Sequence, residues 1–195
     1  MPDTQTWIIL AGVVVLALIG VAAWFLYQKQ QSHKLQQRFG TEYRRTVEEL
    51  GSQTKAESEL KAREKRVAHL NIVPLAPSEA ARFGQAWKAL QSRFVDNPKG
   101  VVVEAGQLVR EVMLKRGYPM GDFEHRAADI SVDHAAVVDN YRAAQAIVVR
   151  DERGDADTEE LRKAVVHYRA LFAELLETRE TKGEVHSSQT LKASS

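Results

Sequence analysis

The chain has 195 residues, and its 27 lysines and arginines nearly balance its 26 aspartates and glutamates, so the formal net charge is +1. This balance excludes a strongly basic nucleic-acid-binding arm or an acidic tail as the dominant feature of the whole chain. The absence of cysteine excludes structural disulfides, cysteine-ligated zinc, iron–sulfur clusters and thiol catalysis.

A continuous apolar run near the N-terminus, Trp7–Tyr27, reads WIILAGVVVLALIGVAAWFLY. At 1.5 Å per helical residue, its 21 residues span roughly 30 Å, the thickness of a bilayer hydrocarbon core. Trp7 lies at one end of the run, and Trp24 and Tyr27 lie at the other, where aromatic rings suit the two headgroup layers. We therefore predict a single transmembrane helix over residues 7–27.

A cleaved signal peptide is the main alternative to a retained span, and a buried core helix is a weaker one. A signal peptide has a basic first segment and an apolar stretch of about 7–15 residues. The short flank before the run, residues 1–6, contains Asp3 but no lysine or arginine, and no small-x-small cleavage site follows the run. Globular helices rarely extend this far without a polar face, so a retained membrane helix is favoured.

Basic side chains follow the predicted span, whereas none precedes it. The positive-inside rule therefore predicts a single-pass cell-membrane protein with its N-terminus outside and everything after Tyr27 in the cytoplasm. Anionic lipid attracts basic residues near the membrane, although a merely solvated helix face would show the same pattern. The candidate lipid-facing residues are Lys29, Lys34, Arg38, Arg44 and Arg45.

Residues 28–75 are predicted to form a basic helical stalk and a linker. A stripe of apolar residues at spacings of four, four, four and three predicts a helix, and Gly51-Ser52 interrupts it, so we expect two helices or one kinked helix. The stripe does not hold a strict heptad, which favours packing against the following domain over a coiled-coil dimer. Its members are Leu35, Phe39, Tyr43, Val47 and Leu50.

Residues 76–177 are predicted to form a small antiparallel helical bundle, and residues 178–195 a disordered tail. Helix starts are expected at Pro77, at Asn97-Pro98, at Asp122 for a short helix to Asp129, near His134, and at Asp157 or Thr158. The helix that begins at Asn97-Pro98 is expected to stop at Gly117. The fold class is therefore all-α. The most apolar stripes are Phe83, Trp87, Leu90 and Phe94, and Leu161, Val165, Tyr168 and Phe172.

The densest polar cluster lies between residues 122 and 134. Imidazoles and carboxylates can hold a divalent metal or act as an acid/base pair, and the candidates of this type are His125, Asp129, Asp133 and His134. However, the paired Glu-x-x-His motifs of di-iron bundles, and the HExxH, P-loop, GxGxxG and GxSxG motifs, are absent. Helix capping is favoured instead, with Asp122 starting one helix, Ser131 and Asp133 starting the next, and Arg126 pairing with a carboxylate. We predict no cofactor and no catalytic residue.

The connection from Gly117 to His134 is the predicted functional surface, and binding rather than catalysis is its predicted role. Binding residues concentrate on such connections, and exposed aromatic residues supply anchors at interfaces. The alternative is that Tyr118 and Phe123 simply seal the end of the bundle. The partner-binding candidates are Tyr118, Met120, Asp122 and Phe123.

Five strings carry a resemblance to a known family: RFGTEYRRTVEE, SRFVDNPKG, KRGYPMGDFEHRAADISVDH, VVDNYRAA and VHYRALFAELL. They resemble a family of small bacterial single-span membrane or secreted proteins, from the span to about Leu176, and the GYP–DFE–RAAD–SVDH block is the clearest part. The resemblance implies no activity, cofactor or catalytic residue. This chain has Ala76-Pro77 and His134-Ala135 where the family often has Ser-Pro and His-Pro, a difference that touches helix capping only.

The sequence therefore predicts a membrane-anchored helical interaction or scaffold module with a protein partner. One alternative is a small metal-dependent or acid/base enzyme that uses the 122–134 cluster, and another is a sensor of anionic lipid that uses the basic stalk. Nucleic acid is a poor fit, because the bundle has no basic excess and its aromatic residues lie in core stripes.

Overall fold

The structure, a computed structural model, describes the backbone of residues 4–176 and the side chains of residues 16–176. Within these residues every regular element is a helix, which confirms the predicted all-α class. Residues 1–3 of the predicted flank and the predicted tail, 178–195, lie outside the described residues. The helices are α1 (Thr4–Phe39), α2 (Thr41–Leu50), α3 (Gln53–Ala68), α4 (Pro77–Ser92), α5 (Pro98–Arg116), α6 (Phe123–Asp133), α7 (Ala135–Glu152) and α8 (Thr158–Leu175).

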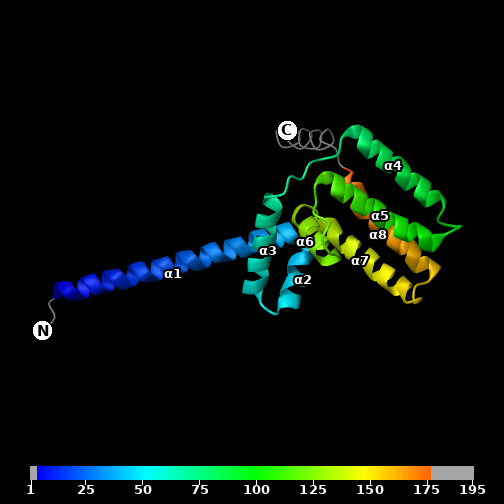
Figure 1. The fold of residues 1–195 in the computed structure, drawn as a ribbon. Helices are drawn as coiled ribbons and strands as arrows, with labels where there is room; N and C mark the ends of the chain where they lie inside the picture. The colour runs from blue at the N-terminus through cyan, green and yellow to red at the C-terminus, as the bar shows by residue number, and fades with distance from the viewer. Residues whose placement is uncertain (1–3, 177–195) are drawn as a thin grey trace, which may run out of the picture.

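Helix α1 extends away from the rest of the molecule as one long rod (Figure 1). Its large apolar side chains between Leu16 and Tyr27 are 53–70% exposed, on all sides of the helix. Farther along, Leu35 and Phe39 are buried, so the end of α1 packs against the rest of the molecule whereas its earlier part does not. Over the part of the chain that the structure describes, no helix is both long and apolar enough to cross a membrane. The side chains of residues 7–15 of the predicted span lie outside that part.

The segment predicted as a stalk folds back against the bundle. Gly40 and Gly51 adopt positive φ angles of 51° and 62°, which glycine reaches without steric cost, and they separate α1, α2 and α3. The prediction that the apolar stripe packs on the following domain is confirmed for its first three members, which share a cluster with Val132 of α6. Leu50, the last residue of α2, is 43% exposed at the turn and takes no part. The buried members of this cluster are Leu35, Phe39, Tyr43, Leu60, Val67 and Val132.

The bundle begins and ends its helices largely where the sequence predicted. Pro77 occupies the first turn of α4, and the Asn97 side chain accepts a hydrogen bond from the backbone N–H of Gly100. Asp157 and Glu160 form a capping box at the start of α8. Gly117 ends α5 with a φ of 95°, and a Cβ there would lie 2.4 Å from the Asn71 carbonyl oxygen, so only glycine fits. These local features place α4, α5, α7 and α8 around one core (Figure 1).

Helix α6 is longer than predicted, because it runs to Asp133 instead of ending at Asp129. Its buried apolar residues continue at helical spacing as far as Val132, which keeps the helix packed past the predicted end. The prediction that Ser131 and Asp133 begin the next helix is therefore wrong. Ser131 is fully buried within α6 and donates its hydroxyl to the carbonyl of Ala128. Among the described residues Arg126 has no carboxylate partner either; its Nε donates to the Tyr141 hydroxyl.

Candidate binding surfaces

The four candidate metal ligands do not converge. Each has a separate partner at a distance of 2.8 to 3.8 Å, and no group of three histidine or acidic residues in the described part of the chain could hold a metal ion. The side chains of His125, Asp129, Asp133 and His134 contact, in that order, those of Asp122, Arg66, Arg38 and Glu174. The structure therefore gives the enzyme alternative no shared site among these residues.

The four candidate partner-binding residues divide into core and surface. Tyr118 is only 2% exposed, and burial raises the pKa of its hydroxyl to about 12, so its assignment to a binding surface is wrong. It fills the end of the bundle, which was the alternative interpretation. Phe123 is half-buried, and its ring centroid lies 4.8 Å from that of Tyr141. Met120 is exposed, as is Asp122, which caps α6 by accepting a hydrogen bond from the backbone N–H of His125.

A largely apolar groove of about 810 Å³ lies beside Phe123, and we name it the α6–α7 groove. Ala146 and Val149 line it from α7, at a spacing that places them on one face of that helix. Three guanidinium groups and two carboxylates also line it, from Arg45, Arg142, Arg150, Asp122 and Glu124. Periodicity does not predict this face, because Ala146 and Val149 are small and lie directly beside the buried stripe of α7.

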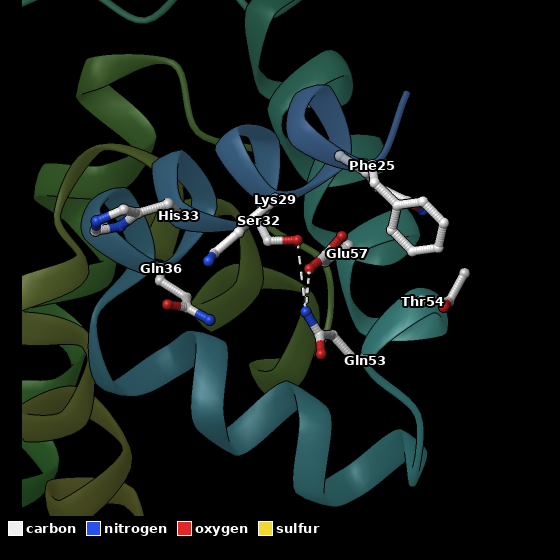
Figure 2. A pocket seen from close by; sticks show the side chains of 9 residues that line it. Phe25, Lys29, Ser32, His33, Gln36, Gln53, Thr54 and Glu57 are labelled. Atoms are coloured by element: carbon white, nitrogen blue, oxygen red, sulfur yellow. Dashed lines mark hydrogen bonds between the residues drawn. The ribbon is translucent and has the colours of Figure 1, made fainter. Parts of the chain in front are cut away.

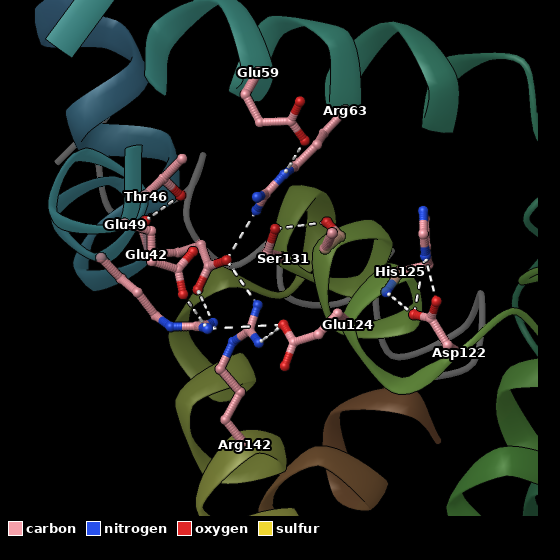
Figure 3. A network of polar contacts seen from close by, with 12 residues as sticks. Glu42, Thr46, Glu49, Glu59, Arg63, Asp122, Glu124, His125, Ser131 and Arg142 are labelled. Carbon is pink, nitrogen blue, oxygen red and sulfur yellow. Dashed lines mark hydrogen bonds and ion pairs between the residues drawn. The ribbon is translucent and has the colours of Figure 1, made fainter. Parts of the chain in front are cut away.

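A buried carboxylate, Glu42 of α2, lies next to the groove among three arginines (Figure 3). Arg63 of α3 and Arg142 of α7 donate to its Oε1 from 2.8 and 3.0 Å. Arg45 lies 3.7 Å from its Oε2. Arg142 also donates to Glu124 of α6. This Glu42 network therefore joins four helices, and Glu42 itself is only 1% exposed.

Electrostatics within the Glu42 network favour the charged form of Arg142. Burial alone would lower the pKa of Arg142, but its hydrogen bonds and the charges of Glu124 and Glu42 raise it above the usual value. The second oxygen of Glu42 and the Nε of Arg142 are buried without a hydrogen-bond partner in the described residues. The network therefore links these helices through paired buried charges, and removing one partner would leave another buried charge unpaired.

The five predicted lipid-facing residues are not equivalent. Arg38 donates to Glu64 and to the Val132 carbonyl, and Arg45 pairs with Glu49, so both are used within the fold. The exposed remainder consists of Lys29, Lys34 and Arg44, for which the described part of the chain provides no ion-pair partner. The basic surface next to the predicted span is therefore smaller than the sequence suggested.

His134 lies in a second buried polar site at the junction of α6 and α7. Burial lowers the pKa of its imidazole below the usual 6.5, and the positive charge of Arg116 on α5 lowers it further. Glu174 of α8, 3.3 Å from Nδ1, and Asp133 of α6 oppose that shift. The neutral imidazole is therefore the form that the fold favours.

We expect acid to destabilise the chain through His134. Because its pKa is lower in the folded than in the unfolded chain, the unfolded chain binds more protons as the pH falls below 6.5. The free energy of unfolding should therefore decrease between about pH 7 and pH 5.5, by at most about 1.4 kcal/mol per pH unit. Urea titrations of the wild type and of His134→Gln measure this slope. An equally steep slope in His134→Gln would contradict the assignment.

Comparison of the chain with protein-family models, with curated proteins and with solved structures finds no match.

Proposed function

We propose that the chain is a single-pass protein of the bacterial cell membrane that presents a helical binding module to the cytoplasm. The apolar part of α1 would be the anchor, with the N-terminus outside. Three features support this anchor: the apolar run Trp7–Tyr27, the outward-facing apolar side chains from Leu16 to Tyr27, and the basic residues that follow. A fully exposed apolar helix of this kind needs an apolar environment, which a bilayer provides.

The α6–α7 groove is the feature that supports a binding role. Ala146 and Val149 are small, so a partner helix could approach α7 closely and place its larger apolar side chains over them. A face of about two helical turns suits the helix-in-groove mode of recognition. Three arginines and two carboxylates line the groove, and each arginine is paired within the fold: Arg150 with Glu160, Arg142 with Glu42 and Glu124, and Arg45 with Glu49. The partner is therefore an amphipathic helix with an aliphatic stripe and polar residues at its edges.

Site-specific photo-cross-linking in living cells tests this function. A photoreactive residue at Val149 should give one adduct in the membrane fraction, and mapping should place the adduct on an amphipathic helix. The same residue at Val166, a 60% exposed position of α8, should not give that adduct.

Ala146→Glu should reduce the Val149 adduct at least about tenfold, because it adds bulk and a charge to the apolar face of the groove, and a loss of ~1.4 kcal/mol of binding free energy is enough for this effect. Gln107→Glu, an exposed position of α5, is the matched control. Both substitutions should change the free energy of unfolding by less than about 0.5 kcal/mol. Identical adducts from positions 149 and 166, or no effect of Ala146→Glu, would reject the groove as the binding site.

A further inference from the structure

A second groove, of about 510 Å³, lies between α1 and the start of α3 (Figure 2), and we name it the membrane-proximal groove. Its α1 residues recur at spacings of three and one, so they form one face of that helix. Its α3 residues come from the first turns of that helix. The lining is Phe25, Gln28, Lys29, Ser32, His33 and Gln36 of α1, with Gln53, Thr54 and Glu57 of α3.

The groove lies directly after the predicted span, which ends at Tyr27. Lys29 and Ser32 lie two and five residues farther on, which at 1.5 Å per residue is roughly 3–8 Å beyond the hydrocarbon core. The headgroup layer on each side of a bilayer is about 5–8 Å thick, by the difference between total and core thickness. Phe25 lies just inside the core boundary. The groove therefore opens at the depth of lipid headgroups.

Glu57 supplies a negative charge at the floor of the groove. Tyr43 Oη and Gln53 Nε2 both donate to its Oε1, from 2.8 and 2.9 Å. Burial would raise the pKa of Glu57, but the neighbouring Ser32 hydroxyl and the hydrogen bonds from Gln53 and Tyr43 lower it below the usual value, so the carboxylate is ionised. Its Oε2 accepts no hydrogen bond from the described residues and is not sealed from solvent. One carboxylate oxygen thus remains available to an N–H donor in the groove.

Lys29 supplies a positive charge on the opposite wall. Its ammonium has no ion-pair partner in the described part of the chain. The other lining groups, apart from His33 and Phe25, are amides and hydroxyls, which both donate and accept hydrogen bonds. A carboxylate and an ammonium on facing walls, with neutral polar groups between them, match a ligand that carries one positive and one negative charge.

We propose that the membrane-proximal groove binds the headgroup of an ethanolamine phospholipid, with the ligand ammonium on Glu57 Oε2 and the phosphate at Lys29. The ethanolamine ammonium has N–H groups to donate to the carboxylate, whereas a choline headgroup has none. An anionic headgroup such as phosphoglycerol would bring only its negative charge toward Glu57. This inference rests on the proposed membrane span and is independent of the α6–α7 groove.

Native mass spectrometry of the full chain in mild detergent tests the proposal with three lipids that have identical acyl chains. Phosphatidylethanolamine should bind at least about tenfold more tightly than phosphatidylcholine or phosphatidylglycerol, the difference expected for a hydrogen bond to a charged group. Glu57→Gln should remove most of this preference. Lys29→Gln should weaken phosphatidylethanolamine binding severalfold, whereas Lys34→Gln, the same change of charge at an exposed position outside the groove, should leave binding unchanged.

The possible outcomes distinguish a failure of the headgroup site from a failure of the proposed membrane span. Equal affinity for the ethanolamine and choline lipids, or a preference for phosphatidylglycerol, would overturn the proposal, as would equal losses in Lys29→Gln and Lys34→Gln. Equally tight binding of soluble glycerophosphoethanolamine would assign the groove to a soluble ligand and also overturn it. Flotation of the same protein with phosphatidylcholine vesicles tests the span alone. Because Lys29 is exposed, its variant should fold even if Glu57→Gln does not.

Discussion

Glu42→Ala should lower the free energy of unfolding by about 3–5 kcal/mol, the usual cost of removing one partner from a buried ion pair. The substitution would leave Arg63 and Arg142, whose side chains are 9% and 13% exposed, without the carboxylate that both contact. Thermal and urea denaturation of the full chain in mild detergent, followed by circular dichroism, measures the loss. Removing one partner from a surface charge pair costs far less stability, so the burial of the pair determines the size of the effect.

Glu49→Ala is the matched control for this expectation. Glu49 lies two turns after Glu42 on the same helix and pairs with Arg45, but its side chain is 49% exposed. Its removal should therefore cost less than about 1 kcal/mol. Similar losses for Glu42→Ala and Glu49→Ala would show that the Glu42 network contributes no more than a surface pair. A triple variant with Glu42→Leu, Arg63→Met and Arg142→Leu should be more stable than Glu42→Ala, because it leaves no buried charge unpaired.

The Glu42 network also marks the limit of what the sequence could predict. Apolar stripes, prolines in first turns and the glycine at 117 are local signals, and they placed most helices of the bundle correctly. The pairing of Glu42 with Arg142 joins residues one hundred positions apart, and nothing in the local sequence distinguishes Glu42 from the exposed acidic residues around it. The sequence therefore predicts that the segment 28–75 packs on the bundle through its apolar stripe, but not the polar contacts that join α2 to α7 and α3 to α6.

The binding surfaces were predicted less well than the fold, for a related reason. Tyrosine is a residue type common among interface anchors, but the turn at Gly117 directs the Tyr118 side chain into the core, where it is 2% exposed. The two grooves are formed by facing helices, so their shape depends on interhelical geometry that periodicity does not encode. Only Asp122 and Phe123 of the predicted partner-binding set line the α6–α7 groove, and only Lys29 of the predicted lipid-facing set lines the membrane-proximal one.

Trp87→Ala should lower the free energy of unfolding by about 3–5 kcal/mol, the range for removing a large buried aromatic side chain. Trp87 is 4% exposed in the bundle core, and its ring is stacked on Phe172 with centroids 4.5 Å apart. The indole Nε1 is buried without a hydrogen-bond partner in the described residues, so the contribution of this side chain comes from packing. Trp87→Phe should therefore cost much less than Trp87→Ala, because it keeps an aromatic ring against Phe172. Val95→Ala, at a 90% exposed position, should change stability by less than about 0.5 kcal/mol. Urea denaturation of the three variants in the same detergent measures these differences, and an unchanged midpoint for Trp87→Ala would mean that α4 is not part of the cooperative core.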